Sequence, residues 1–177
     1  MKISLSPSNP EWRSWFAQEK AKLLQILSAE IVCYVEHIGS TAVEELDAKP
    51  IVDILLGLSN FEKDAPALVQ KMLLSGYIYH PRHEVTMPER RYFTQHYPNT
   101  AQTFHIHAVQ MGGVFWKRHL LFRNFLRQSP ETRNQYQQLK QNLAQQEWNN
   151  GSEYAMAKTD FVKAVELAAE KQLFFEI

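Results

Sequence analysis

The residues best suited to chemistry lie in one short part of the sequence, between His37 and Leu55. Asp53 is the one polar residue in the apolar stretch from Ile51 to Leu56, a pattern typical of a central strand covered on both faces. We therefore expect Asp53 to be buried, with a cation beside it, because burying an unpaired carboxylate costs several kcal/mol. Lys49 could be that cation in a structural salt bridge. Alternatively, Asp53 binds a divalent metal ion and Lys49 contacts phosphate.

A small turn precedes this strand. Gly39 and Ser40 follow a run rich in β-branched residues at 31–38, and Ser40 or Thr41 could cap a short helix that continues to Leu46. A strand that ends in Gly-Ser at a helix start directs backbone N–H groups and the positive helix end toward one point, which suits a phosphate group. A tight turn also needs small residues for steric reasons alone. The nearby buried carboxylate favours the phosphate-binding interpretation.

Two histidines form a second group. His105 and His107 occupy alternate positions of the run from Thr103 to Gln110, in which apolar and polar residues alternate. Side chains two residues apart on a strand point the same way, about 7 Å apart. Both rings could therefore converge on one metal ion or one phosphate, together with Asp53. They could equally be solvent-facing residues of a half-exposed strand.

Further cations could reach the same place. Arg90 and Arg91 begin a strand expected at 90–95, where they must point to opposite faces, so at most one of them faces the site. Of the two, Arg91 is our candidate for a phosphate contact. Lys140 and Lys158 each share a helix face with a tyrosine. Basic residues on surface helices are usually solvated, so the pattern alone assigns these two lysines no function.

The composition limits the classes of partner. The 177 residues include 19 Lys and Arg and 19 Asp and Glu, so no bulk field favours nucleic acid or an anionic membrane, and a charged ligand must be met locally. The single cysteine, Cys33, excludes a disulfide framework. The first residues do not resemble a signal peptide, and no run of about 18 apolar residues occurs. We therefore expect a cytoplasmic protein, and the sequence does not indicate its oligomeric state.

The elements that must position these residues fit one α/β (α+β) domain spanning residues 1–177, with a sheet core at about 1–113 and a helical cap at about 114–177. In the first part, the spacing of apolar residues predicts strands at 31–38, 51–56, 77–79, 90–95 and 103–110. Capping residues and breaks predict helices at 10–27, 60–74, 114–128, 130–148 and 153–174.

Four segments together carry a resemblance to a known family. HIGSTAVEELDAKPIVDILLG, FHIHAVQ, FWKRHLLFRNFLRQSPETRNQYQQLKQNLA and EYAMAKTDFV, in this order and spacing, resemble the GrpB family from about residue 8 to residue 165. The resemblance implies a nucleotidyltransferase-like fold, a small mixed sheet flanked by helices. In that fold a Gly-Ser turn holds phosphates and carboxylates on the next strand hold metal. The matching positions are Gly39, Ser40, Thr41, Lys49, Pro50, Asp53, His105, His107, Arg123, Tyr136, Lys140, Tyr154 and Lys158.

One departure from the wider nucleotidyltransferase pattern affects the expected metal site. Leu55 stands where that superfamily carries a second acid, and His105 or His107 is the nearest candidate for the acid of a later strand. One carboxylate with two imidazoles suits Mn²⁺ or Zn²⁺ better than a pair of Mg²⁺ ions.

The resemblance and the residues together lead to one expected function. We expect a metal-dependent nucleotidyltransferase that acts on a nucleoside triphosphate and an unknown acceptor, with Asp53 and Lys49 as its catalytic residues. The expected metal ligands are Asp53, His105 and His107, and the expected phosphate contacts are Gly39, Ser40, Thr41, Arg91, Lys140 and Lys158. The alternatives are a binding module for a nucleotide or small phosphate that lacks catalysis, and a metal-assisted phosphoester hydrolase.

Overall fold

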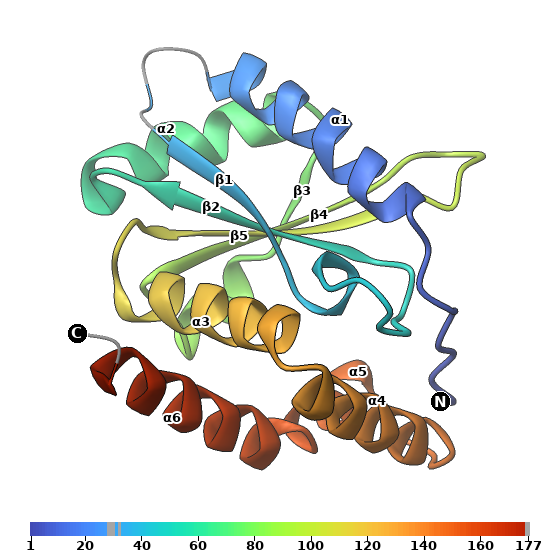
Figure 1. Cartoon of the computed structure of the whole chain (residues 1–177). Helices are drawn as coiled ribbons and strands as arrows, with labels where there is room; N and C mark the ends of the chain where they lie inside the picture. Colours follow the sequence, from blue (N-terminus) through green and yellow to red (C-terminus); the bar gives the residue numbers. More distant parts are fainter. Residues whose placement is uncertain (28–30, 32, 176–177) are drawn as a thin grey trace.

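The strands expected at 51–56 and 103–110 become neighbours in the middle of a five-stranded mixed sheet, in the order β1-β2-β5-β4-β3 (Figure 1). The computed structural model describes residues 1–27, 31 and 33–175, so position 32 of the first expected strand lies outside it. Strands β2 and β5 are parallel, and the other neighbouring pairs are antiparallel. The strands are β1 (Cys33–Ile38), β2 (Val52–Leu58), β3 (Ile78–Tyr79), β4 (Arg90–His96) and β5 (Thr103–Gln110).

Helices cover both faces of this sheet. Helices α1 (Glu11–Leu27) and α2 (Phe61–Leu74) lie on one face, and α3 (Val114–Gln128) lies on the other (Figure 1). The three remaining helices form a layer beyond α3 (Figure 1), and α3 contacts the first and the last of them. They are α4 (Pro130–Ala144), α5 (Gly151–Met156) and α6 (Thr159–Phe175). None of the described helices is both long enough and apolar enough to cross a bilayer.

Side-chain caps explain where several helices begin. Asn9 accepts the backbone N–H of Glu11 at 2.9 Å, and Asn60 accepts that of Lys63 at 3.1 Å. Ser129 caps α4 in the same way and is followed by proline, whose missing N–H costs nothing in the first turn. These positions agree with the helix starts expected from the sequence.

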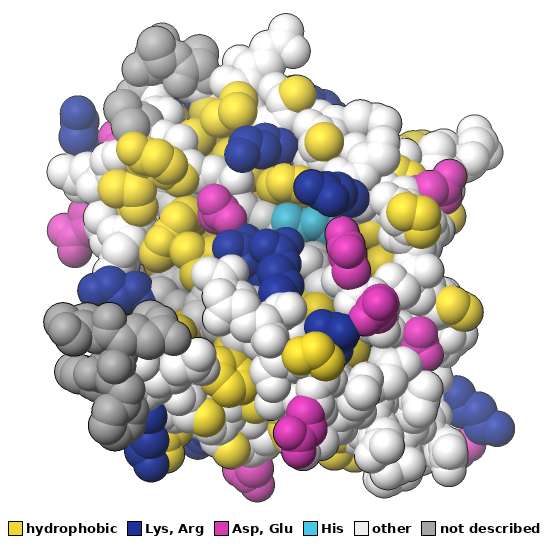
Figure 2. Space-filling view, viewed as in Figure 1, with side chains coloured by type: hydrophobic (Ala, Val, Ile, Leu, Met, Phe, Trp, Pro, Cys, Tyr) yellow, Lys and Arg dark blue, Asp and Glu magenta, His cyan; other side chains and the backbone are white. Residues whose placement is uncertain are grey.

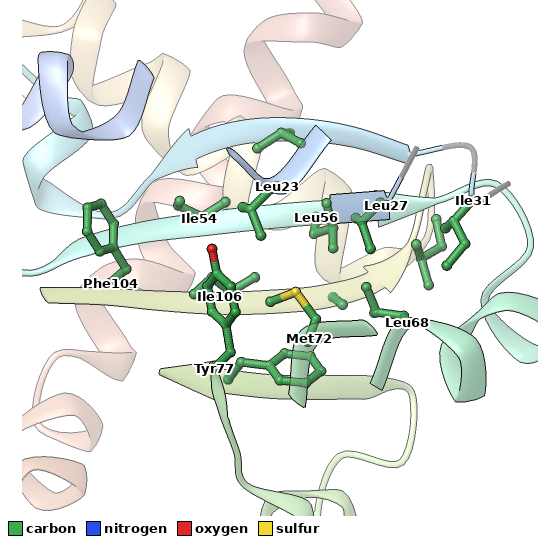
Figure 3. Packing of buried hydrophobic residues seen from close by; sticks show 14 of the residues in the cluster. Leu23, Leu27, Ile31, Ile54, Leu56, Leu68, Met72, Tyr77, Phe104 and Ile106 are labelled. Carbon is green, nitrogen blue, oxygen red and sulfur yellow. The ribbon is translucent and has the colours of Figure 1, made fainter. Parts of the chain in front are cut away.

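Alternation along the central strands divides the core. On the side of α1 and α2, Ile54 and Leu56 pack with Leu23, Met72 and Ile106 (Figure 3). On the side of α3, a smaller cluster is formed by Ile38, Leu55 and Val109 with Phe115, Trp116 and Leu120. Because Asp53 has the same parity as Leu55, its side chain lies on the α3 side, where it can face the helical cap.

Three expected helices are corrected. The short helix expected to reach Leu46 is only a three-residue 3-10 turn, η2 (Ser40–Ala42), and Glu45 has a φ of 64°, which no right-handed helix allows. The last expected helix is two helices with a break at residues 157–158. The helix expected at 130–148 ends at Ala144, because the following segment turns to contact the N-terminal residues, where Lys2 bridges to Glu147.

Candidate functional site

The Gly-Ser turn and the carboxylate of Asp53 lie in direct contact. Antiparallel pairing sets Ile38 opposite Asp53, so Gly39 comes next to the carboxylate at the end of β1. Gly39 has a φ of 71°, and a Cβ atom there would lie 2.4 Å from Oδ2 of Asp53. Only glycine satisfies both conditions. A second link is provided by Thr41, whose hydroxyl donates to the Ile51 carbonyl at 3.2 Å.

The expected group of one carboxylate and two imidazoles is also present. The parallel register pairs Asp53 with His105, and Oδ1 of Asp53 lies 3.5 Å from Nδ1 of His105 and 3.8 Å from Nε2 of His107. Burial opposes ionisation of Asp53, but the two histidines outweigh it and hold the pKa of that carboxyl below its ordinary value. The Asp53 side chain is 31% exposed, so it is less buried than the strand pattern indicated, because it faces a cavity.

The structural salt bridge with Lys49 does not occur. Among the described residues, the ion-pair partners of Asp53 are the two histidines. The Lys49 ammonium instead lies 5.3 Å from the ring centroid of Tyr154. Asp53 is therefore held by imidazole N–H groups, which leaves the charge of Lys49 available to a ligand.

The metal-binding role expected for Asp53, His105 and His107 stays a prediction. Within the described part of the chain, no three His, Cys, Asp or Glu side chains are placed to hold a metal ion. Nη1 of Arg90 lies 3.2 Å from Nδ1 of His107, so a fixed positive charge already occupies this wall. The position of the expected second acid, Leu55, is fully buried in the apolar cluster under α3. The residues therefore do not fit a two-metal site.

Three lysines from separate segments converge beside this group. The Lys158 ammonium lies 4.5 Å from the ring centroid of Tyr154, the same ring that Lys49 faces. Lys140 is 1% exposed and donates a hydrogen bond to the Asp47 carbonyl. Burial, and then the Lys158 ammonium, lower the pKa of Lys140 to about 7. Burial, and then the Lys49 ammonium, lower the pKa of Lys158 to about 8. These charges repel one another, and Asp47 and Asp53 offset that repulsion only in part.

All these groups line one cavity of about 740 Å³, within the usual size range of small-molecule sites. We call it the phosphate cavity, after the ligand expected from the sequence. It is bordered by five basic side chains, Lys49, Arg82, Arg90, Lys140 and Lys158, against the single carboxylate of Asp53. A chain with no net charge thus concentrates positive charge at one place. Eight of the ten expected site residues line it: Ser40, Thr41, Lys49, Asp53, His105, His107, Lys140 and Lys158.

The structure places Arg91 away from the other expected residues. It lies on the opposite face of the sheet, with Nη1 3.2 Å from Oε2 of Glu84 and its guanidinium 5.0 Å from the Phe61 ring centroid. Arg90 takes the position that we assigned to Arg91. Strand parity predicted that only one of the two arginines would face the site. Parity alone could not decide which one, because it does not show which face of β4 packs against the core.

Sequence reasoning assigned no role to the aromatic partners of the site. Tyr92 stacks on His107 with ring centroids 5.0 Å apart, and Tyr136 is hydrogen-bonded to Ser40. Tyr92 shares the parity of Arg90 on β4, so the strand pattern contained the signal once Arg90 was placed. Nothing in the local pattern indicated that Tyr136, 96 residues beyond Ser40, would reach the turn.

A second group of basic residues lies elsewhere on the surface. Figure 2 shows dark-blue Lys and Arg side chains around a histidine on the face that carries β1. A cavity of about 760 Å³ lies at this edge. Two of its arginines are engaged by the protein itself, because Arg123 contacts Glu36 at 2.6 Å and Arg127 donates twice to the Ala42 carbonyl. These guanidinium groups support the edge of the sheet, so the phosphate cavity is the better ligand site.

Comparisons with known proteins agree with this fold. The model of the GrpB protein family matches residues 2–167. The chain is 32% identical over 170 residues to UPF0157 protein YqkA of Bacillus subtilis, covering 96% of this chain and 48% of YqkA, so it spans about half the length of that relative. It is 29% identical to glutamate-rich protein GrpB of Alkalihalophilus pseudofirmus, covering 92% and 93% of the two chains.

A solved structure extends the likeness to three dimensions. The crystal structure of conserved protein GrpB from Enterococcus faecalis superimposes with a TM-score of 0.81 at 34% identity, covering 97% of this chain and 99% of the other. The family match, the relatives and the shared fold lead to one conclusion. The chain belongs to the GrpB family.

Proposed function

We propose that this protein binds a nucleoside triphosphate, or a related phosphoester with several negative charges, in the phosphate cavity. The observation that carries the proposal is the convergence of Lys49, Lys140 and Lys158 on one cavity without a carboxylate in ion-pair contact among the described side chains. Holding mutually repelling ammonium groups together is costly in the free protein. An anionic ligand would remove that cost, and the gain would appear as binding energy.

The phosphate contacts follow from the lining of the cavity. The lysines would neutralise phosphate charge, and the Ser40 hydroxyl would donate to a phosphate oxygen. The helix dipole contributes little, because η2 has only three residues. Binding therefore rests on side-chain charge more than on the helix terminus that we expected from the sequence.

Nucleotidyl transfer is a second candidate, favoured by the position of Asp53. Its carboxylate lies in the wall of the same cavity as the lysines, beside the Gly39 turn. In that reaction an acceptor oxygen would attack the α-phosphorus, form a phosphodiester and release pyrophosphate, whose charge the lysines would offset. Any divalent ion would arrive as part of the metal-triphosphate substrate, with Asp53 facing it.

Thermal unfolding in the presence of ligand tests the binding proposal. ATP, GTP, CTP, UTP and inorganic tripolyphosphate, each with and without Mg²⁺ or Mn²⁺, should raise the melting temperature, because a ligand that binds only the folded state stabilises it. Lys140→Met should reduce this shift, whereas Lys63→Met, at an exposed position on α2, should leave it intact. No shift with any of these compounds at millimolar concentration would refute the proposal.

The fate of the nucleotide separates the two candidates. Incubation with a candidate acceptor should release pyrophosphate if nucleotidyl transfer occurs, and Asp53→Asn should abolish that release while tripolyphosphate still binds. Recovery of unchanged triphosphate would identify a binding module. Release of orthophosphate instead would indicate the phosphoester hydrolase alternative.

A further inference from the structure

A second cavity adjoins the phosphate cavity on the same side of the sheet. It has a volume of about 740 Å³ and lies between β5, the start of α3 and the start of α6. We call it the aromatic cavity. Four residues line both cavities, Met87, Arg90, His107 and Ala155. Because they share this wall, one ligand could extend from the phosphate cavity into the aromatic cavity.

A continuous series of rings leads from one cavity to the other. Tyr92 stacks on His107 at 5.0 Å, His107 faces Phe115 at 5.9 Å, and Phe115 stacks on His119 at 4.0 Å between ring centroids. The Arg90 guanidinium lies beside this series, 5.2 Å from the Tyr92 centroid and 5.7 Å from that of Phe115. Planar rings with an adjacent guanidinium are the groups on which nucleobases stack in proteins.

The rest of the aromatic cavity is suited to an uncharged body. Val114 in its wall is 75% exposed and Met87 is 37% exposed, so apolar surface faces solvent at its rim. Two long polar side chains of the wall are bonded within the protein: Gln110 accepts the Phe61 N–H at 2.9 Å, and Arg118 pairs with Glu166 at 2.8 Å. The carboxylate of the wall, Glu89, is exposed and would repel phosphate rather than a base. Ligand burial here would gain hydrophobic and stacking energy rather than new ion pairs.

We infer that the aromatic cavity binds the heteroaromatic base of the ligand whose phosphates occupy the phosphate cavity. This inference rests on the proposed function and specifies its ligand as a nucleotide rather than an inorganic polyphosphate. Because Gln110 and Arg118 are bonded within the protein, the base is held by its faces more than by its edges. The four common bases should therefore be discriminated weakly.

Titration calorimetry on the full chain, with inorganic tripolyphosphate and with ATP, GTP, CTP and UTP, tests the inference. Stacking of one base corresponds to roughly a tenfold gain in affinity or more. We expect wild-type protein to bind ATP at least about tenfold more tightly than tripolyphosphate, with the four nucleotides within about tenfold of one another. Phe115→Leu keeps an apolar side chain but removes the ring, and should bring ATP to the affinity of tripolyphosphate.

Two further variants control the result. Phe16 also stacks on a histidine, because its ring centroid lies 4.8 Å from that of His37, but this pair is on the other face of the sheet. Phe16→Leu should therefore retain the preference for ATP. Thr159→Phe, at the start of α6, should fill the aromatic cavity and lower ATP affinity without changing tripolyphosphate affinity. This variant preserves the test if Phe115→Leu unfolds.

The outcomes distinguish this inference from the proposed function. Equal affinity of wild-type protein for ATP and tripolyphosphate would leave the phosphate cavity supported and overturn the base site. The same conclusion would follow if both Phe115→Leu and Thr159→Phe retained the full preference for ATP. Failure of ATP and tripolyphosphate alike to bind would overturn the proposed function, and this inference with it.

Discussion

Replacing Lys140 with methionine tests whether the phosphate cavity stores uncompensated charge. The lysine is 1% exposed, its ammonium donates to the Asp47 carbonyl, and Lys158 lies close enough to add to the shift of its pKa from 10.5 to about 7. Methionine has similar length and flexibility but carries no charge. If the cavity is built for an anionic ligand, removing this charge should relieve the free protein.

The magnitude follows from the pKa shift of Lys140. A shift from 10.5 to about 7 corresponds to up to about 5 kcal/mol against the charged form in the fold. Methionine forfeits the hydrogen bond to Asp47 and leaves a carbonyl unpaired, at a cost of roughly 1 to 3 kcal/mol. We therefore expect Lys140→Met to be more stable than wild type by about 1 to 3 kcal/mol at pH 7.

The pH dependence gives this prediction a distinctive sign. The pKa of Lys140 is lower in the folded state, so between about pH 7 and 10.5 the unfolded chain binds more protons, and wild-type stability rises with pH. Near pH 10 the lysine penalty has largely disappeared, and only the lost hydrogen bond distinguishes the variant. Lys140→Met should then be less stable than wild type, which reverses the order found at pH 7.

Urea denaturation of both proteins at pH 7 and pH 10 measures this reversal. Lys63→Met, which removes an exposed lysine from α2, serves as the matched control and should change stability little at either pH. A loss of several kcal/mol by Lys140→Met at both pH values would show that the ammonium is a compensated structural cation. The central argument for an anion site would then fail.

Three other predictions follow from particular contacts. Gly39→Ala should destabilise the protein by roughly 2 kcal/mol more than Gly76→Ala, because both have positive φ but only the first Cβ would strike Asp53; equal losses in thermal unfolding would contradict this. Glu19→Gln should cost roughly 1 to 3 kcal/mol in urea denaturation, because the buried carboxylate accepts two tyrosine hydroxyls at 2.5 and 2.7 Å; no measurable loss would argue against that network. Burial lowers the pKa of His37 to about 4, so the unfolded chain takes up a proton first and stability should fall as pH decreases from about 6.5. Between pH 7 and 4.5, wild type should lose roughly 2 kcal/mol more stability than His37→Gln. Parallel losses in the two proteins would rule out this histidine as the cause.

Local patterns predicted most of the fold. All five strands and all the α-helix starts before residue 150 occur close to the expected positions. Period-two alternation, side-chain caps and glycine turns act between residues a few positions apart, so their effects can be read without the tertiary structure. The same patterns failed at residues 43–46, where a helix was expected, because burial of Val43 and Leu46 against α3 and α4 governs the backbone there.

Part of the candidate site was predictable for the same reason. Asp53 interrupts an apolar strand, and His105 and His107 share one face of another, so each signal lies within a single element. Whether the strands were neighbours could not be read from either element. The parallel pairing of β2 with β5 brought the carboxylate within 3.8 Å of both rings, and only this pairing made them one group.

By itself, then, the sequence determined the elements, the Gly39 turn and the isolated carboxylate of Asp53, because these depend on local conformation and on the cost of burying charge. Only the tertiary structure places the side chains of Lys140 and Lys158 in the wall of the phosphate cavity. A lysine on a polar helix face carries no local sign of burial. Its environment is set by how α4 and α5 pack against the segment before β2, and such contacts join residues far apart in the chain.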